Sequence, residues 1–128
     1  MESGSLELLD DYLTEEDLIN FQNNSLPNQV LIIKFTATWC MPCKKIKSIT
    51  EECVKTIPKF IKFIEIDIDE SIELYMKLKN KKMVNGIPAI LAYKGGEHEY
   101  WYIPDDSCLV GNVEEVKKFF ERTIKMIE

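Results

Sequence analysis

The stretch VLIIKFTATWCMPCKK, residues 30–45, joins an apolar run to two cysteines that stand three positions apart. Residues 30–36 are almost wholly apolar and rich in β-branched side chains, which predicts a strand covered on both faces. Pro42 and apolar residues at steps of three and four follow, and this spacing predicts a helix. Cys40 is therefore expected where a strand ends and a helix begins.

Hydrophobic spacing along the rest of the chain predicts alternating helices and strands. Thr14 followed by Asp17 is a helix start signal, a hydroxyl cap with an acid three residues later. Helices are expected over residues 42–57, 71–79 and 113–127, with Asn112 capping the last, and strands over 60–68, 89–93 and 97–103. Lys94-Gly95-Gly96 predicts a hairpin between the last two strands. This order predicts a three-layer α/β domain with early parallel strands and a closing antiparallel hairpin.

Apolar rows indicate which faces of two later helices meet the core. In residues 71–79, one row holds Ile72, Tyr75 and Met76, and a second row holds Leu74 and Leu78. The buried side of the last helix is predicted to consist of Val113, Val116, Phe120 and Ile127.

Length and composition predict one soluble domain. A chain of 128 residues with 45% hydrophobic and 30% charged residues is long enough to bury a core without disulfides. We expect a single domain over residues 1–128, with a core of about residues 14–127 and an amino-terminal extension of residues 1–13. The net charge of −6 argues against nucleic acid as a partner.

The amino end, MESGSLELLDDYL, carries acids where a signal peptide needs positive charge. The longest apolar stretch is far too short to cross a bilayer. We therefore expect a cytoplasmic protein with no membrane partner.

The predicted position of the cysteine pair favours redox chemistry. Unpaired N–H groups and partial positive charge at a helix start stabilise a thiolate, with weaker support from Lys44 and Lys45. Cys40 is thus predicted to be an exposed nucleophile of low pKa. Cys43 lies one turn further on, is expected to face inward, and can attack a mixed disulfide formed on Cys40.

Structural alternatives for the pair are weaker. A structural zinc site normally needs four ligands, and the other candidates, Cys53, Cys108 and His98, supply no second paired spacing. We expect no metal. Cys53 falls on the apolar stripe of the helix over residues 42–57 and is predicted to lie in the core. Cys108 is interpreted as a buried small residue, with a third redox thiol as the alternative.

Several segments together resemble the thioredoxin family. Residues 35–44 (FTATWCMPCK) resemble its active-site strand and turn, although the family usually has Gly-Pro between the cysteines. Gly86-Ile87-Pro88 is similar to its cis-proline loop, Lys94-Gly95-Gly96-Glu97 to its hairpin turn, and residues 63–69 to its central strand. The resemblance covers about residues 14–127. It implies a thioredoxin fold, a three-layer arrangement in which helices lie on both faces of a central mixed sheet.

The resemblance also implies an activity and roles for individual residues. It implies that Cys40 attacks a substrate disulfide, Cys43 resolves the intermediate, and no cofactor is needed. Trp39 would shield the pair and bond to Asp69, and Pro88 would be cis. Substrate contacts are expected from Trp39, Met41, Pro42, Ile87 and Pro88. Implied partners are disulfide-containing proteins and an electron donor like thioredoxin reductase, and a monomer is expected.

Lys34 departs from the family pattern, which usually has a buried aspartate beneath the resolving cysteine. Glu65 on the neighbouring strand is the candidate ion-pair partner, unless Lys34 extends to solvent at the strand edge. A buried Lys34 would favour thiolates. Ser48 replaces a helix-kinking proline of many relatives, so a straighter helix is expected. Residues 97–110 are longer than usual, and they either redirect substrate choice or extend a solvent-covered strand.

Two other functions stay open at the level of sequence. The first is a disulfide isomerase or oxidase, which needs an oxidising compartment. The second is a thioredoxin-like module that binds protein partners with little turnover.

Overall fold

The computed structural model describes residues 12–127, and within that range four strands form one sheet in the order β2-β1-β3-β4. β1 pairs in parallel with β2, and the pairings β1–β3 and β3–β4 are antiparallel. The strands are β1 (Val30–Thr36), β2 (Ile61–Asp67), β3 (Ala89–Lys94) and β4 (Asp106–Cys108). The predicted mixed sheet is confirmed.

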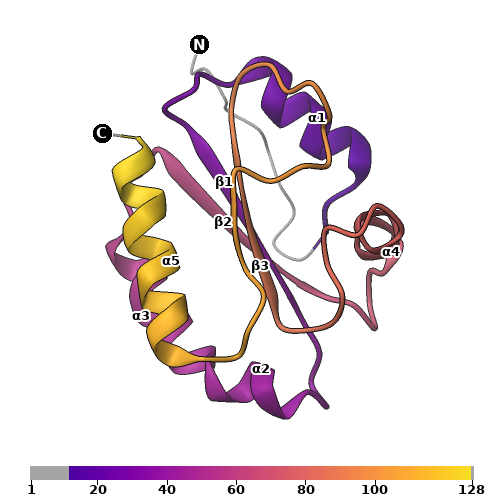
Figure 1. Cartoon of the computed structure of the whole chain (residues 1–128), viewed down its shortest axis with the longest axis vertical. Coiled ribbons are helices and arrows are strands. Elements are labelled where there is room, and N and C mark those ends of the chain that lie inside the picture. The colour runs from indigo at the N-terminus through magenta and orange to yellow at the C-terminus, as the bar shows by residue number, and fades with distance from the viewer. Residues whose placement is uncertain (1–11, 128) are drawn as a thin grey trace.

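Helices cover both faces of this sheet (Figure 1). One face is covered by α1 (Glu15–Asn24) and α4 (Glu73–Asn80), and the other by α3 (Lys47–Thr56) and α5 (Val113–Met126). The short helix α2 (Met41–Lys45) lies beyond the end of β1. The three-layer α/β architecture expected from the sequence is therefore confirmed.

β1 is the centre of the core, and its residues alternate between the two helix layers. Leu31, Ile33 and Phe35 pack into a cluster with α1 and α4, whereas Val30 and Ile32 pack into a second cluster with α5. All five side chains are fully buried. This two-sided burial follows from the period of two in a strand and from the continuous apolar sequence of β1.

The same alternation places Lys34 on the α3 and α5 face of the sheet, among buried side chains. The Lys34 side chain is only 2% exposed, and its Nζ atom lies 2.9 Å from the Oε2 atom of Glu65, whose side chain is 43% exposed. The two residues are direct partners in the parallel register of β1 and β2. The ion pair is thus confirmed, and the alternative in which Lys34 extends to solvent is wrong.

Unequal burial of the two partners predicts unequal losses of stability. Replacing Glu65 by Leu leaves a buried ammonium group without its carboxylate, and we expect the free energy of unfolding to fall by about 3 kcal/mol. Replacing Lys34 by Met leaves a carboxylate that water already reaches, and we expect a loss of about 1 kcal/mol. Urea unfolding of both variants measures these values. A larger loss for Lys34→Met than for Glu65→Leu would contradict this account.

The helix predicted over residues 42–57 is divided at Ile46, so the expectation of a straighter helix is wrong. Ile46 leaves the helical conformation, with φ −101° and ψ 3°. Its carbonyl oxygen accepts hydrogen bonds from both the backbone N–H and the hydroxyl group of Thr50. Such back-bonding by a threonine bends helices, so the bend forms here without proline.

The predicted strand over residues 97–103 is not present, and β3 pairs instead with β4, which follows a longer connection. Backbone and side-chain bonds hold this connection against α1 and β3. The Nε2 group of Gln22 donates to the backbone carbonyl oxygen of Trp101. The hydroxyl group of Tyr93 donates to the backbone carbonyl oxygen of Tyr102. Trp101 and Tyr102 pack against the cluster beneath α1 and α4.

The helices α4 and α5 bury faces that differ in part from those predicted. In α4 the buried residues are Leu74, Tyr75 and Leu78, while Ile72, just before the helix, and Met76 are exposed. In α5 the buried residues are Val116, Phe119, Phe120 and Thr123; Val113 is exposed and Ile127 is half-buried. A helix of 3.6 residues per turn admits two neighbouring rows, and packing against the sheet selects one of them.

At the amino end, Thr14 and Asp17 form the predicted capping box of α1. Most of the extension predicted over residues 1–13 lies outside the described residues. Leu13, the last residue of that predicted extension, is buried in the core.

Candidate active site

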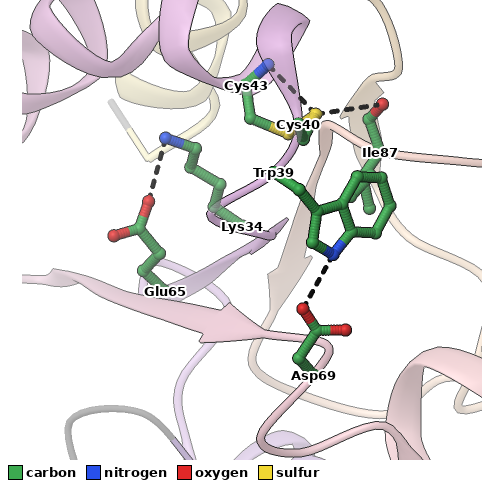
Figure 2. Close-up of a disulfide and its surroundings, with 7 residues drawn as sticks. All are labelled: Lys34, Trp39, Cys40, Cys43, Glu65, Asp69 and Ile87. Atoms are coloured by element: carbon green, nitrogen blue, oxygen red, sulfur yellow. Dashed lines mark hydrogen bonds and ion pairs between the residues drawn. A yellow bond between two sulfur atoms is a disulfide. The ribbon is translucent and has the colours of Figure 1, made fainter.

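Cys40 and Cys43 form a disulfide at the carboxyl end of β1, with their Cα atoms 5.2 Å apart (Figure 2). Cys40 is the residue that caps α2, and Cys43 lies in the first turn of that helix. The strand-to-helix junction predicted for the pair is therefore confirmed. The structure shows the oxidised state, the form that remains after two electrons have been given to a substrate.

The predicted exposure of Cys40 is wrong for this oxidised state. Cys40 is 4% exposed and Cys43 is 2% exposed, and both pack with Ala37, Ile68 and Ile87. Bonding between the two sulfur atoms and packing against these neighbours cover Cys40. Its neighbours Trp39 and Met41 are 62% and 67% exposed, so the covered disulfide still lies close to the surface.

The Cys40 sulfur atom meets one backbone donor and one backbone acceptor. It accepts a hydrogen bond of 3.2 Å from the N–H group of Cys43, and it lies 3.8 Å from the carbonyl oxygen of Ile87. An N–H group that points at a sulfur atom stabilises the thiolate formed on reduction. Because α2 has only five residues, this local bond matters more than the dipole of a long helix.

Trp39 is held beside the pair by the predicted hydrogen bond. Its indole Nε1–H donates to the Oδ2 atom of Asp69 at 2.7 Å (Figure 2). Asp69 lies just past the end of β2, and its own N–H group donates to the Oδ1 atom of Asp67 at 2.8 Å. The exposed indole ring is therefore fixed in orientation at the mouth of the site.

The loop before β3 lies on the other side of the disulfide. The Ile87–Pro88 peptide bond is cis, as the resemblance implied, and Pro88 is buried. Ile87 is half-buried, and its carbonyl oxygen faces the Cys40 sulfur atom. The structure thus brings Ile87 to Trp39 and the two cysteines, from which it is far apart in the sequence.

The end of the segment over residues 97–110, for which a role in substrate choice was one expectation, leads to Gly111, which lies against Pro42. A Cβ atom added to Gly111 would lie 2.9 Å from the Cβ atom of Pro42, so Gly111 lies directly against the start of α2. Leu109 and Val110, which precede it, are 47% and 52% exposed. We call the four exposed side chains around the pair the apolar rim, which consists of Trp39, Met41, Leu109 and Val110. In the sequence, the available signal of this close contact was a glycine, Gly111, just before the helix cap Asn112.

The other two cysteines are reduced and have raised pKa values. Burial raises the pKa of the Cys108 thiol, and burial together with the Glu52 carboxylate raises that of Cys53. Cys108 is buried as expected, whereas Cys53 is only half-buried, which corrects its assignment to the core. Within residues 12–127, no group of three or more His, Cys, Asp or Glu side chains is placed to hold a metal ion.

We predict that Cys40 reacts with iodoacetamide at least about tenfold faster than Cys108 or Cys53 when the reduced protein is treated at neutral pH. A raised pKa means that fewer thiols are ionised at that pH, and only the thiolate reacts, with about a tenfold loss for each pKa unit. Peptide mass spectrometry measures the three rates. In Cys40→Ser the fast-reacting peptide disappears; equal rates for Cys40 and Cys108 would disprove the assignment.

Fold and site together define a thiol-disulfide oxidoreductase with a dithiol centre, and comparison with known proteins agrees. The family model described as Thioredoxin matches residues 13–115. Thioredoxin 1 of Plasmodium falciparum (isolate 3D7) is 34% identical over 95 residues, which cover 74% of this chain and 81% of that protein. The thioredoxin of Rickettsia typhi (strain ATCC VR-144 / Wilmington) is 33% identical over 82 residues, covering 63% and 74%.

A solved structure shows the same fold. The crystal structure of thioredoxin from Trypanosoma brucei brucei aligns with a TM-score of 0.66 over 94% of this chain and 93% of that one, at 22% identity. The chain belongs to the thioredoxin family. It is a protein-disulfide reductase, in a family that acts on disulfide substrates and works with reductase partners. In residues 12–127, every helix is too short or too polar to span a membrane.

Proposed function

We propose that this protein works as a cytoplasmic, monomeric reductant of protein disulfides, with Cys40 as the attacking and Cys43 as the resolving cysteine. The single observation that carries the assignment of roles is the position of the two sulfur atoms. Cys40 caps α2 and accepts the N–H bond of Cys43, whereas Cys43 lies within α2 and lines a cavity. A donor like thioredoxin reductase would restore the dithiol.

The reaction has two exchange steps. The Cys40 thiolate attacks one sulfur atom of a substrate disulfide, a mixed disulfide forms, and the other substrate sulfur leaves as a thiolate. The Cys43 thiolate then attacks the Cys40 sulfur atom, the protein disulfide forms, and the second substrate sulfur leaves. Two electrons pass from the dithiol to the substrate, and the thiol protons of Cys40 and Cys43 are released to solvent.

Trapping the mixed disulfide tests these roles. We expect reduced Cys43→Ser to accumulate a covalent complex with disulfide-bonded insulin, because nothing resolves the bond on Cys40, while Cys40→Ser forms none. Non-reducing electrophoresis detects the complex, and turbidity of wild-type reactions with dithiothreitol measures turnover. A complex formed by Cys40→Ser but not by Cys43→Ser would reverse the roles. Complexes of the wild type without turnover would favour the binding module.

We further assign the apolar rim to the docking of protein substrates. Trp39 and Met41 come from the start of α2, and Leu109 and Val110 reach the same place through the contact between Gly111 and Pro42. Exposed apolar side chains around a reactive group bury area only when a protein chain covers them. Met adapts to varied surfaces, which suits a site that meets different partners.

A charge placed in this rim is expected to weaken the binding of protein substrates and to leave small disulfides almost unaffected. We predict that Val110→Asp raises the KM for insulin about tenfold or more, because a carboxylate loses its water when a partner covers it. The rate at which the reduced protein exchanges with a small disulfide, such as oxidised dithiothreitol, should stay within about twofold of the wild-type rate, since a small molecule covers little of the rim. The matched control is Ile103→Asp, an exposed apolar residue in the connection before β4. Equal changes for both variants would exclude the rim as the docking surface.

A further inference from the structure

We infer that Lys34 is a positioning residue for the charge on Cys43, and that its buried ammonium group stabilises the thiolate that resolves the mixed disulfide. This inference rests on the proposed function, since it concerns the second exchange step. Lys34 does not touch the substrate. It acts through Cys43, from β1, the strand beyond whose end α2 begins.

The geometry brings the two groups to one cavity. Lys34 lies on β1, on the same face as Ile32, and Cys43 belongs to α2, which begins just beyond the end of that strand. Both residues line a cavity of about 360 Å³. Lys34 is fully buried, and its ammonium group has one carboxylate partner, Glu65, which lies to the side on β2.

The other charges around this cavity are more exposed to water. Its charged lining residues, besides Lys34, are Lys44 from α2, Lys47 from α3, and Glu65 and Asp67 from β2. Lys44 and Lys47 are exposed, and Glu65 and Asp67 are partly exposed. Water and salt screen such charges, whereas they screen a buried ammonium group much less. The most deeply buried charge among these lining residues is therefore positive, and its carboxylate partner, Glu65, is the more exposed member of the pair.

A positive charge changes the chemistry of the resolving step in a defined way. An ammonium group has no lone pair, so Lys34 in that form cannot take the proton from the Cys43 thiol. The proton leaves to solvent in the cavity, and Lys34 stabilises the anion that remains. The Cys43 thiolate then bonds to the Cys40 sulfur atom, and the substrate sulfur departs with the electron pair of the broken bond.

Lys34→Met removes the charge while keeping an unbranched side chain of similar length. In the full chain with Cys40→Ser, which leaves Cys43 without its partner as in the mixed disulfide, we expect this change to raise the pKa of Cys43 by about 1. The pKa is measured from the pH dependence of iodoacetamide alkylation of the Cys43 peptide. Lys34→Arg is expected to restore the wild-type value, because it keeps the charge. Lys44→Met, which removes an exposed charge of the same cavity, should have a much smaller effect.

Kinetics of the resolving step give a second readout with no natural substrate. Ellman's reagent forms a mixed disulfide on Cys40 and releases one thionitrobenzoate, and attack by Cys43 then releases a second. We expect the second release to become about tenfold slower at neutral pH in Lys34→Met. The midpoint of its pH profile should move upward by about one pH unit, as the Cys43 pKa does. If this variant does not fold, the pair Lys34→Met and Glu65→Leu together removes both charges and serves in its place.

An unchanged Cys43 pKa and an unchanged second release in Lys34→Met would overturn the inference and leave Lys34 with a structural role only. Equal shifts in Lys34→Met and Lys44→Met would overturn it as well, since the effect would then come from net charge. Failure of the proposed function has a different signature, because wild-type protein would then not turn over insulin even if the Cys43 pKa responds to Lys34.

Discussion

Burial of β1 on both faces is the constraint on which the rest of the structure depends. The side chains of β1 alternate between two helix layers, so each side chain must face a particular layer. A shift of the strand by one residue would move every side chain to the opposite layer. The chain leaves this strand at Thr36 and reaches Cys40 within four residues. The disulfide is thus placed by the packing of the core and by the contacts of α2.

The same alternation turns one unusual residue into part of the site. Residues of β1 with even numbers face α3 and α5, and a lysine at such a position cannot reach water. It is tolerated because the parallel register sets Glu65 beside it, and because Glu65 remains open to solvent. The resemblance described from the sequence implies an aspartate at this place, so a positive charge stands here where that pattern has a negative one.

Residues 97–110, the long segment between β3 and α5, reach two ends of the molecule. Lys94, at the end of β3, pairs with Val30 at the start of β1, so the connection begins far from Cys40. The backbone carbonyls of Trp101 and Tyr102 are bonded there to Gln22 of α1 and Tyr93 of β3. β4 then returns toward the site, and Gly111 meets Pro42. Only the last residues of the insertion border the disulfide.

The sequence by itself determined the elements whose signals are local. Continuous apolar residues specified β1, the capping box specified α1, and the spacing and surroundings of Cys40 and Cys43 specified a dithiol at a strand-to-helix junction. Resemblance to the family supplied the Trp39–Asp69 bond and the cis peptide bond before Pro88, which no local rule requires.

Tertiary structure decided what depends on competition between distant groups. Residues 97–103 have strand propensity, but the edge of β3 pairs with Asp106–Cys108, and the aromatic side chains gain more by covering the core. The covering of Cys40 by Ile87 and the contact of Gly111 with Pro42 likewise arise from packing. Such contacts join residues far apart in the chain, and their energies appear only once the sheet has placed those residues together.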